Sequence, residues 1–370
     1  MMMGMPKPSL ANVLAVALLG GALVSVIFAQ PQPERDPDAQ PTGIFNTRFH
    51  ERSPLSSRER MAEVGHWRAQ QLTEWDINEI EFQMVVPDGY TGEEPYGLLV
   101  FIHPSDDITA IEPRRFFFGR VIEDVLAEHK LIWVSFDEAG NPVLPNKRMG
   151  LALDAVHNVT QHFNIDERRI YISGMSGGGR MTCMSAIYYP QIFTGAIPIV
   201  GSLYFNEVPI PDDPAQRRLL REQPGENAVW GARLIPPQRP ELDRMKREQR
   251  WVLLTGDEDF NMPEMRSHFE HGFERDEFQH AHYLEVPGMG HSYPNAEWFE
   301  RAIVLLDAPL NEEADEDGNA IDDSPRERRA QEQAQRRLAS ALRLVERDPA
   351  RALRLLRRVD ELYPDTRAAE

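Results

Sequence analysis

Short apolar runs alternate with stretches of helical periodicity between residues 80 and 310. The continuous apolar run at 97–103 is typical of a strand that is covered on both faces, and residues 131–136 are expected to be the next buried strand. Strands that alternate with helices at this spacing predict an α/β fold with a doubly wound, mainly parallel sheet. We expect strands at residues 80–86, 97–103, 131–136, 169–173, 195–200, 251–255 and 281–286, and helices at 117–129, 148–163 and 296–306.

The same pattern divides the chain of 370 residues into a core and its appendages. Residues 76–310 form the expected α/β domain, which contains a Pro- and Arg-rich insertion at 203–248 without a strong strand signal. A long insertion of this kind is either a lid over a pocket or a surface excursion. Residues 31–75 are expected to be a linker and an exposed helical lead-in. The acidic residues 311–327 are expected to be a solvated linker.

Residues 328–370 have the pattern of a helical hairpin. Asp348-Pro349 is a helix-start signal that separates two helical segments. The hairpin resembles one tetratricopeptide unit, which cannot bury its apolar faces alone. It is therefore expected to pack on the main domain or on a protein partner. Apolar residues repeat at helical spacing in both segments, at Leu338, Ala341, Leu342 and Val345, and at Ala352, Leu355, Leu356 and Val359.

The N-terminal residues 1–30 have the pattern of a targeting segment. Lys7 precedes the uncharged and largely apolar residues 10–29, and a polar linker begins at Gln30. The pattern predicts a signal peptide that is cleaved near Ala29, and hence export to the periplasm or the extracellular space. The apolar run is also long enough to span a bilayer once, so an uncleaved membrane anchor is the alternative.

Charge and cysteine content exclude several classes of protein. The formal net charge of −19 argues against nucleic acid as a partner, because phosphate binding requires a basic face. The single cysteine, Cys183, excludes an intramolecular disulfide and a Cys-based zinc site. Cys183 falls on the inside of an expected helix, where we expect a buried structural thiol.

A serine motif lies between the expected strand at 169–173 and the helix that follows it. Gly174-Met175-Ser176-Gly177-Gly178 has the form Gly-x-Ser-x-Gly, in which a sharp strand-to-helix turn exposes the serine hydroxyl. Glycines at 174 and 178 remove the Cβ atoms that would collide across this turn. The motif predicts that Ser176 is a nucleophile. The backbone N–H of Gly177, at the helix N-terminus, is expected to bind an oxyanion.

A serine nucleophile requires a base and an acid, which in this fold follow it in the order acid, then histidine. His291 lies in a Gly-flanked loop after the last expected strand, and we expect it to be the base. The acid is expected after the strand at 251–255. The spacing of strand, Gly, two residues and Asp selects Asp259, and Asp257 stays the alternative.

A second oxyanion donor is expected in the loop that follows the strand at 97–103. Pro104 lacks an N–H and cannot donate, so the N–H of Ser105 is the expected donor. His103 is expected to order this loop rather than to react. No metal site is expected, because neither histidine pair, His268 with His271 or His280 with His282, has an obvious third ligand.

Residues from about 82 to 307 resemble α/β-hydrolase esterases, and are similar to secreted polyhydroxybutyrate depolymerases and feruloyl or acetyl-xylan esterases. The segments VVPDGY, RRIYISGMSGGGRMT and PGMGHSYP carry this resemblance. The resemblance implies an α/β-hydrolase fold and hydrolysis of a small-molecule or polymeric carboxylic ester through an acyl-enzyme, without a cofactor. It also implies catalytic roles for Ser176, Asp259 and His291 at the matching positions.

Two other functions fit parts of the pattern. The same triad also cleaves amides, so a serine peptidase on the same fold is one alternative. The absence of a propeller-sized domain before the catalytic region argues against the oligopeptidase arrangement. A non-catalytic binding or scaffold protein, with the C-terminal hairpin as its docking element, is the other alternative. The presence of all three triad residue types in order argues against it.

Overall fold

The computed structural model describes residues 41–64, 72–105, 118–225, 227–316 and 353. The expected targeting segment at 1–30 lies outside the described residues. So does the expected hairpin at 328–370, apart from Leu353, and most of the acidic linker. In the part of the chain that is described, no helix has the length and apolarity needed to cross a membrane.

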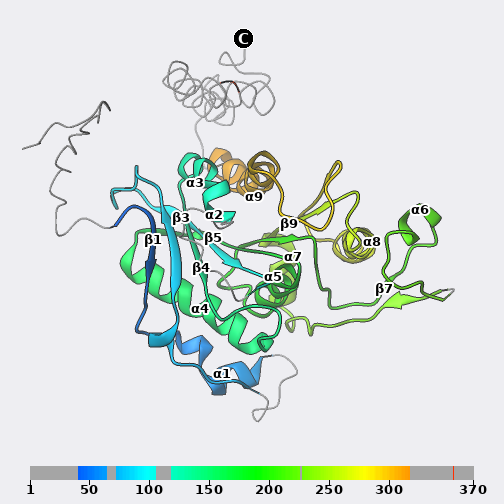
Figure 1. Cartoon of the computed structure of the whole chain (residues 1–370), viewed down its shortest axis with the longest axis horizontal. Coiled ribbons are helices and arrows are strands. Elements are labelled where there is room, and N and C mark those ends of the chain that lie inside the picture. The colour runs from blue at the N-terminus through cyan, green and yellow to red at the C-terminus, as the bar shows by residue number, and fades with distance from the viewer. Residues whose placement is uncertain (1–40, 65–71, 106–117, 226, 317–352, 354–370) are drawn as a thin grey trace, which may run out of the picture. The chain divides into compact units, whose positions relative to one another are not determined.

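An eight-stranded sheet forms the centre of the described residues (Figure 1). Its strand order is β1-β2-β4-β3-β5-β6-β9-β10. Strand β2 pairs antiparallel with β1 and β4, and every other pair is parallel. The predicted mainly parallel α/β sheet is therefore confirmed. The strands are β1 (Gly43–Thr47), β2 (Phe82–Val86), β3 (Tyr96–Ile102), β4 (Leu131–Phe136), β5 (Ile165–Met175), β6 (Gly195–Ile199), β9 (Arg250–Gly256) and β10 (His280–Val286).

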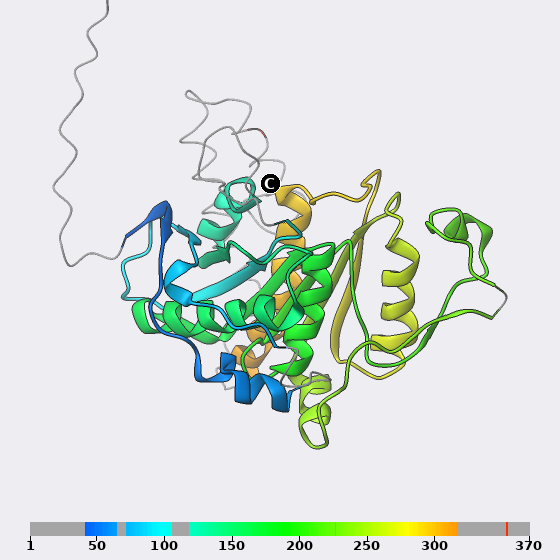
Figure 2. The same cartoon turned by 60° about the horizontal axis from the view of Figure 1, so that its bottom comes forward.

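Helices cover both faces of this sheet and bury the apolar strand runs (Figures 1 and 2). One core cluster joins the sheet to α2, α3 and α9, and contains Phe101 and Trp133. The other cluster joins the opposite face to α1, α4, α5 and α8. Burial on both faces explains why β3 is a continuous apolar run and why β4 is apolar except for Ser135. The helices are α1 (Arg58–Glu63), α2 (Phe118–Val121), α3 (Glu123–Glu128), α4 (Pro145–His162), α5 (Gly177–Tyr188), α8 (Met262–His268) and α9 (Ala296–Glu316).

The lead-in differs from its expected form at Gly43–Thr47, which form β1 and extend the sheet at its edge. Helix α1 agrees with the expected helical lead-in. The lead-in is also bound to the domain through Asp154, a fully buried residue of α4. Its carboxylate accepts hydrogen bonds from the Ser53 N–H at 2.8 Å and from the Trp75 indole at 2.9 Å. These contacts attach Ser53 and Trp75 to the main core.

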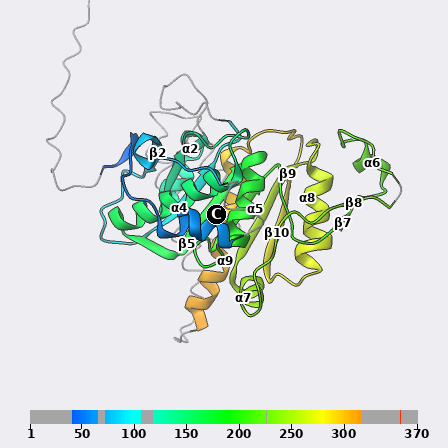
Figure 3. The ribbon, with the colours of Figure 1, turned by 90° about the horizontal axis from the view of Figure 1, so that it is seen from below.

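The insertion at 203–248 also differs from its expected form. It contains a short antiparallel pair, β7 (Val208–Pro209) with β8 (Val229–Trp230), and two helices, α6 (Pro214–Arg217) and α7 (Glu241–Glu248). Two-residue strands leave almost no periodic signal in a sequence, which explains why they were missed. Strand β7 and helix α6 contact α8, and they lie beyond α8 at the β10 side of the sheet (Figures 2 and 3).

Other element boundaries shift by a few residues. The helix expected at 117–129 is interrupted at Ile122 between α2 and α3. Helix α9 continues to Glu316, so residues 311–316 are helical rather than part of a linker. The expected burial of Cys183 is confirmed, and burial raises the pKa of its thiol to about 12. The thiol therefore stays protonated and acts as a small apolar side chain.

Candidate active site

Ser176 occupies a strained turn between β5 and α5. Strand β5 ends at Met175, α5 begins at Gly177, and Ser176 between them has φ 57° and ψ −115°. A positive φ is uncommon for any residue with a Cβ atom and costs on the order of 1–3 kcal/mol. The turn is held from the neighbouring strand, because the Ser176 N–H donates to the Ile199 carbonyl at 2.8 Å.

Glycine is required at two positions of this turn because backbone segments approach closely there. A Cβ atom on Gly178 would lie 1.9 Å from the Ile102 carbonyl oxygen at the end of β3. A Cβ atom on Gly174 would lie 2.6 Å from the same oxygen and from the backbone of Gly178. Backbone atoms cannot move aside as a flexible side chain would, so the Gly-x-Ser-x-Gly spacing follows from these contacts.

His291 lies between Ser176 and Asp259. Its Nε2 atom is 2.9 Å from Ser176 Oγ, and its Nδ1 atom is 2.7 Å from Asp259 Oδ1. The second carboxylate oxygen of Asp259 accepts from the Thr255 hydroxyl at 3.0 Å. The Asp259 carboxylate is fully buried, whereas the His291 side chain is 23% exposed. We call these three residues the serine–histidine–aspartate chain.

Asp257, the alternative acid, has a different position. It is exposed, and its Oδ1 atom accepts from the Gly288 N–H at 2.7 Å. Gly288 belongs to the loop between β10 and His291, so Asp257 connects the two loops that carry Asp259 and His291. The Asp257 N–H also donates to the Val286 carbonyl at 3.2 Å. Asp257 therefore contacts the backbone of the histidine loop, and Asp259 contacts the imidazole.

The environment of Gly177 includes a residue that sequence reasoning missed. The side chain of Asn141 lies directly beside Gly177, because a Cβ atom on Gly177 would lie 1.8 Å from Asn141 Oδ1. Asn141 follows β4, and its N–H donates to the Pro104 carbonyl at 2.9 Å, which joins it to the expected oxyanion loop. Ser105 is exposed, and it is not one of the described residues that line the cavity at Ser176. Asn141 does line that cavity.

His103 is buried behind the site rather than exposed in it. Its Nδ1 atom is 3.2 Å from the Tyr293 hydroxyl, and its carbonyl accepts from Arg148 Nη2 at 3.0 Å. Burial lowers the pKa of His103 to about 3. The neutral imidazole thus connects the residue that follows β3 to Tyr293.

The Ser176 hydroxyl and His291 open into a cavity of about 950 Å³, which we call the central cavity. Most of its wall comes from residues that follow the carboxyl ends of β4, β5, β6, β9 and β10, where sites form in parallel sheets. The insertion supplies Leu203, Arg221 and Arg233 to this wall. It is therefore part of the pocket, which favours the lid interpretation.

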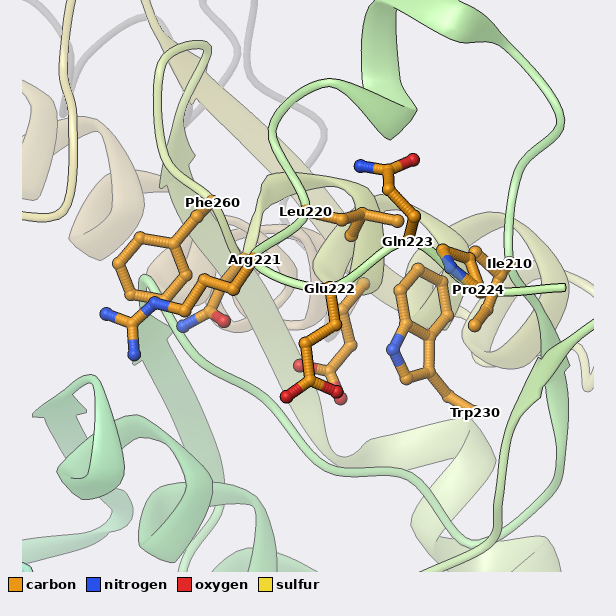
Figure 4. Close-up of a pocket in the computed structure, with 10 residues that line it drawn as sticks. Ile210, Leu220, Arg221, Glu222, Gln223, Pro224, Trp230 and Phe260 are labelled. Carbon is orange, nitrogen blue, oxygen red and sulfur yellow. The ribbon is translucent and has the colours of Figure 1, made fainter.

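A second pocket of about 410 Å³, the side pocket, adjoins the central cavity. Both pockets are lined by Arg221, Phe260 and Asn261. The side pocket is built mainly by the insertion, and Trp230, Pro224 and Ile210 form its apolar end (Figure 4). A ligand that extends from the central cavity into the side pocket therefore passes Arg221 and Phe260.

The other histidines that the structure describes do not gather into a metal site. No group of three or more His, Cys, Asp or Glu residues within the described ranges is arranged to hold an ion. His268 is buried against Ser202 Oγ at 2.8 Å, and burial lowers its pKa to about 3. His282 is half-buried, and burial lowers its pKa as well.

Two curated proteins share short segments with this chain. Poly(3-hydroxyalkanoate) depolymerase C of Paucimonas lemoignei is 43% identical over 49 residues, which are 13% of this chain and 12% of the depolymerase. Acetylxylan esterase of Coprinopsis cinerea is 34% identical over 92 residues, which are 20% of this chain and 25% of the esterase. The chain thus spans a quarter or less of the length of these relatives.

A family model matches a longer segment. Residues 135–297 fit the model of the prolyl oligopeptidase family, and this segment contains the whole serine–histidine–aspartate chain. The eight-stranded, mainly parallel sheet with helices on both faces has the α/β-hydrolase fold. A solved structure similar to this chain is FphF, a fluorophosphonate-binding serine hydrolase of Staphylococcus aureus. The two are 18% identical with a TM-score of 0.45, over 72% of this chain and 99% of FphF.

Proposed function

We propose that this α/β-hydrolase cleaves carboxylic esters through an acyl-enzyme on Ser176. One observation carries the proposal: an unbroken hydrogen-bond path runs from Ser176 Oγ through His291 to the buried Asp259. A nucleophile in contact with a base, which is itself oriented by a third group, is the arrangement that nucleophilic catalysis requires.

The proposed reaction has two halves. Ser176 Oγ attacks the ester carbonyl while His291 Nε2 takes its proton, and the imidazolium then donates that proton to the departing alcohol. Water attacks the acyl-enzyme with His291 again as the base, which releases the acid and restores the serine hydroxyl. Asp259 keeps the proton on Nδ1 during both halves, so that Nε2 is free to accept.

The oxyanion that forms in each half needs donors on the opposite side of the carbonyl. The Gly177 N–H belongs to the first turn of α5, where amides have no intrahelical partner. We propose Ser105 N–H or the side-chain amide of Asn141 as the second donor. An Asn141→Ala variant should lose about 10²-fold in kcat if Asn141 donates, and an unchanged kcat would assign the role to Ser105.

The names of the relatives support an ester as the substrate, because one relative is a depolymerase of a polyester and the other an acetylxylan esterase. The family model instead favours a second candidate, a serine peptidase, since its name refers to an oligopeptidase. The serine–histidine–aspartate chain is compatible with either bond. The ester has the stronger claim because its carbonyl is more reactive and its leaving group needs less assistance.

A pair of substrates separates the two candidates. We expect the full chain to hydrolyse 4-nitrophenyl butyrate, and the matching 4-nitroanilide far more slowly. In a folded Ser176→Ala variant, the ester activity should fall by at least 10³-fold. Faster cleavage of the anilide would select the peptidase. A folded wild type that neither hydrolyses these substrates nor reacts with a fluorophosphonate would instead indicate a non-catalytic binding protein.

We also propose that the protein is exported, on the basis of the apolar segment at 10–29 and the polar linker after it. Expression in a bacterial host with fractionation and N-terminal sequencing tests this proposal. A mature protein that begins near residue 30 in the periplasm or medium supports cleaved export. A full-length protein in the membrane fraction supports the anchored alternative. A full-length protein in the cytoplasm contradicts both.

A further inference from the structure

Charged side chains of only one sign line the central cavity. No Asp or Glu of the described residues contributes to its wall. Four arginines do, and they are Arg148, Arg180, Arg221 and Arg233. The whole chain has the opposite bias, with 59 acidic against 40 basic residues. An excess of cations around the reacting serine therefore does not follow from composition.

Two of the four arginines have structural partners. Arg180 forms an ion pair with Glu264 at 2.7 Å, and this carboxylate neutralises its charge. Arg148 is buried and donates to the His103 carbonyl at 3.0 Å. Arg221 and Arg233 are exposed, and neither forms an ion pair with any carboxylate of the described residues. Neither has an ion-pair partner in this part of the chain, and the nearest pocket carboxylates, Glu222 and Glu264, line the side pocket rather than the central cavity.

Arg221 is held in place by a stack of rings. Its guanidinium lies 3.6 Å from the centroid of the Phe260 ring, as Figure 4 shows. Phe260 in turn stacks on the His291 imidazole, with ring centroids 4.2 Å apart and an angle of 28°. A guanidinium on an aromatic face loses less freedom when it binds a ligand than a free side chain would. The stack thus places a positioned cation one ring away from the proposed base.

We propose that the ester substrate carries a carboxylate, which Arg221 and Arg233 bind. The proposal rests on ester hydrolysis at Ser176 and specifies the class of ester. The planar guanidinium matches a carboxylate with two parallel hydrogen bonds. The carboxylate belongs to either the acyl or the alcohol part of the ester, because Arg233 lines the central cavity and Arg221 lines both that cavity and the side pocket.

Two matched pairs of esters test the proposal in the full chain. Mono-4-nitrophenyl glutarate against 4-nitrophenyl pentanoate places the charge in the acyl part. The second pair is 3-acetoxybenzoate and methyl 3-acetoxybenzoate. Cleavage of the acetyl ester is compared, and the charge lies in the alcohol part. In at least one of the two pairs, kcat/KM of the charged ester should exceed that of the neutral ester by about three- to tenfold. The expected effect is modest because these arginines are exposed to solvent. Added salt should reduce this advantage.

Variants identify the side chains that are responsible. Arg221→Gln and Arg233→Gln should each lower the charged-to-neutral ratio toward one. Arg244→Gln, an exposed arginine on α7 of the same insertion and outside the cavity wall, should leave the ratio unchanged. The ratio is measured on a single enzyme sample, so a variant that folds in reduced yield still gives a valid result.

The outcomes separate this inference from the proposed function. If neutral esters are hydrolysed at Ser176 and neither charged ester is preferred, the carboxylate proposal is wrong and ester hydrolysis stands. The proposal is also wrong if Arg244→Gln lowers the ratio as much as Arg221→Gln does, because the preference would then reflect net charge. If no ester is hydrolysed, both proposals are wrong.

Discussion

Asp257 and Asp259 lie two residues apart after β9, but their carboxylates have different surroundings. Asp259 is fully buried between the Thr255 hydroxyl and His291 Nδ1. Asp257 is exposed and accepts from a backbone N–H of the histidine loop. A buried carboxylate that accepts from Nδ1 selects the imidazole tautomer in which Nε2 can accept a proton.

The two residues therefore predict different effects of the same substitution. Asp259→Asn should lower kcat on 4-nitrophenyl butyrate by about 10²–10⁴-fold with a small change in KM, because the amide no longer enforces that tautomer. Asp257→Asn, the matched control, should lower kcat by less than about tenfold, since it weakens one loop contact. Steady-state kinetics of both variants measure this difference. The reverse order would make Asp257 the triad acid.

The residues of the serine–histidine–aspartate chain could be identified from the sequence because each has a local signature. Ser176 lies in a glycine turn, and Asp259 follows its strand at a defined spacing. Arg221, Arg233 and Asn141 could not be identified in this way. Each of them lies on a loop or in the insertion, and long-range packing determines where these segments lie. No local sequence pattern predicts that packing.

At the scale of elements, the site depends on close contact between the loops after β9 and β10. A Cβ atom on Gly256 would lie 1.8 Å from the Met289 carbonyl oxygen. The Glu258 N–H also donates to that oxygen at 3.2 Å. Gly256→Ala must therefore separate the loops that hold Asp259 and His291. It should lower the free energy of unfolding by roughly 1–3 kcal/mol, with a loss of about 10²-fold in kcat/KM.

Gly290 provides the control for this substitution. It lies next to His291, but no atom is within 4 Å of a Cβ atom built on it, and its φ is not in the left-handed region. Gly290→Ala should change the free energy of unfolding by less than about 0.5 kcal/mol. Urea denaturation and kcat/KM are measured for both variants. Equal values for the two would mean that the loops are less tightly packed than the structure indicates.

The elements that the sequence predicted well are those that are buried on both faces. Strands β3, β4 and β9 are mostly apolar along their length, because helices cover both of their sides. Strand β1 was missed because it is a half-buried edge strand, Gly43–Thr47, whose pairing with β2 depends on residues far along the chain. Edge strands and two-residue strands owe their existence to tertiary packing rather than to periodicity.

At the scale of the whole molecule, burial of neutral histidines ties stability to pH. Burial lowers the pKa of His103 and of His268 to about 3 in the folded chain, against an ordinary value near 6.5. The unfolded chain therefore binds protons more readily than the folded chain between these values. The stabilisation that comes from keeping these two histidines neutral is fully present above about pH 6.5, and it is lost as the pH decreases toward 3. Asp154, whose pKa burial raises, acts in the opposite direction.

Each buried histidine should therefore remove about 2 kcal/mol from the free energy of unfolding between pH 7 and pH 5. His268→Asn keeps a polar group within reach of Ser202 but removes the titrating imidazole. Between pH 7 and pH 5, the free energy of unfolding of this variant should therefore fall by about 2 kcal/mol less than that of the wild type. Urea denaturation at both pH values compares the variant with the wild type. If the pH dependence of His268→Asn equals that of the wild type, His268 is protonated in the folded chain, and its imidazole must then be accessible to water.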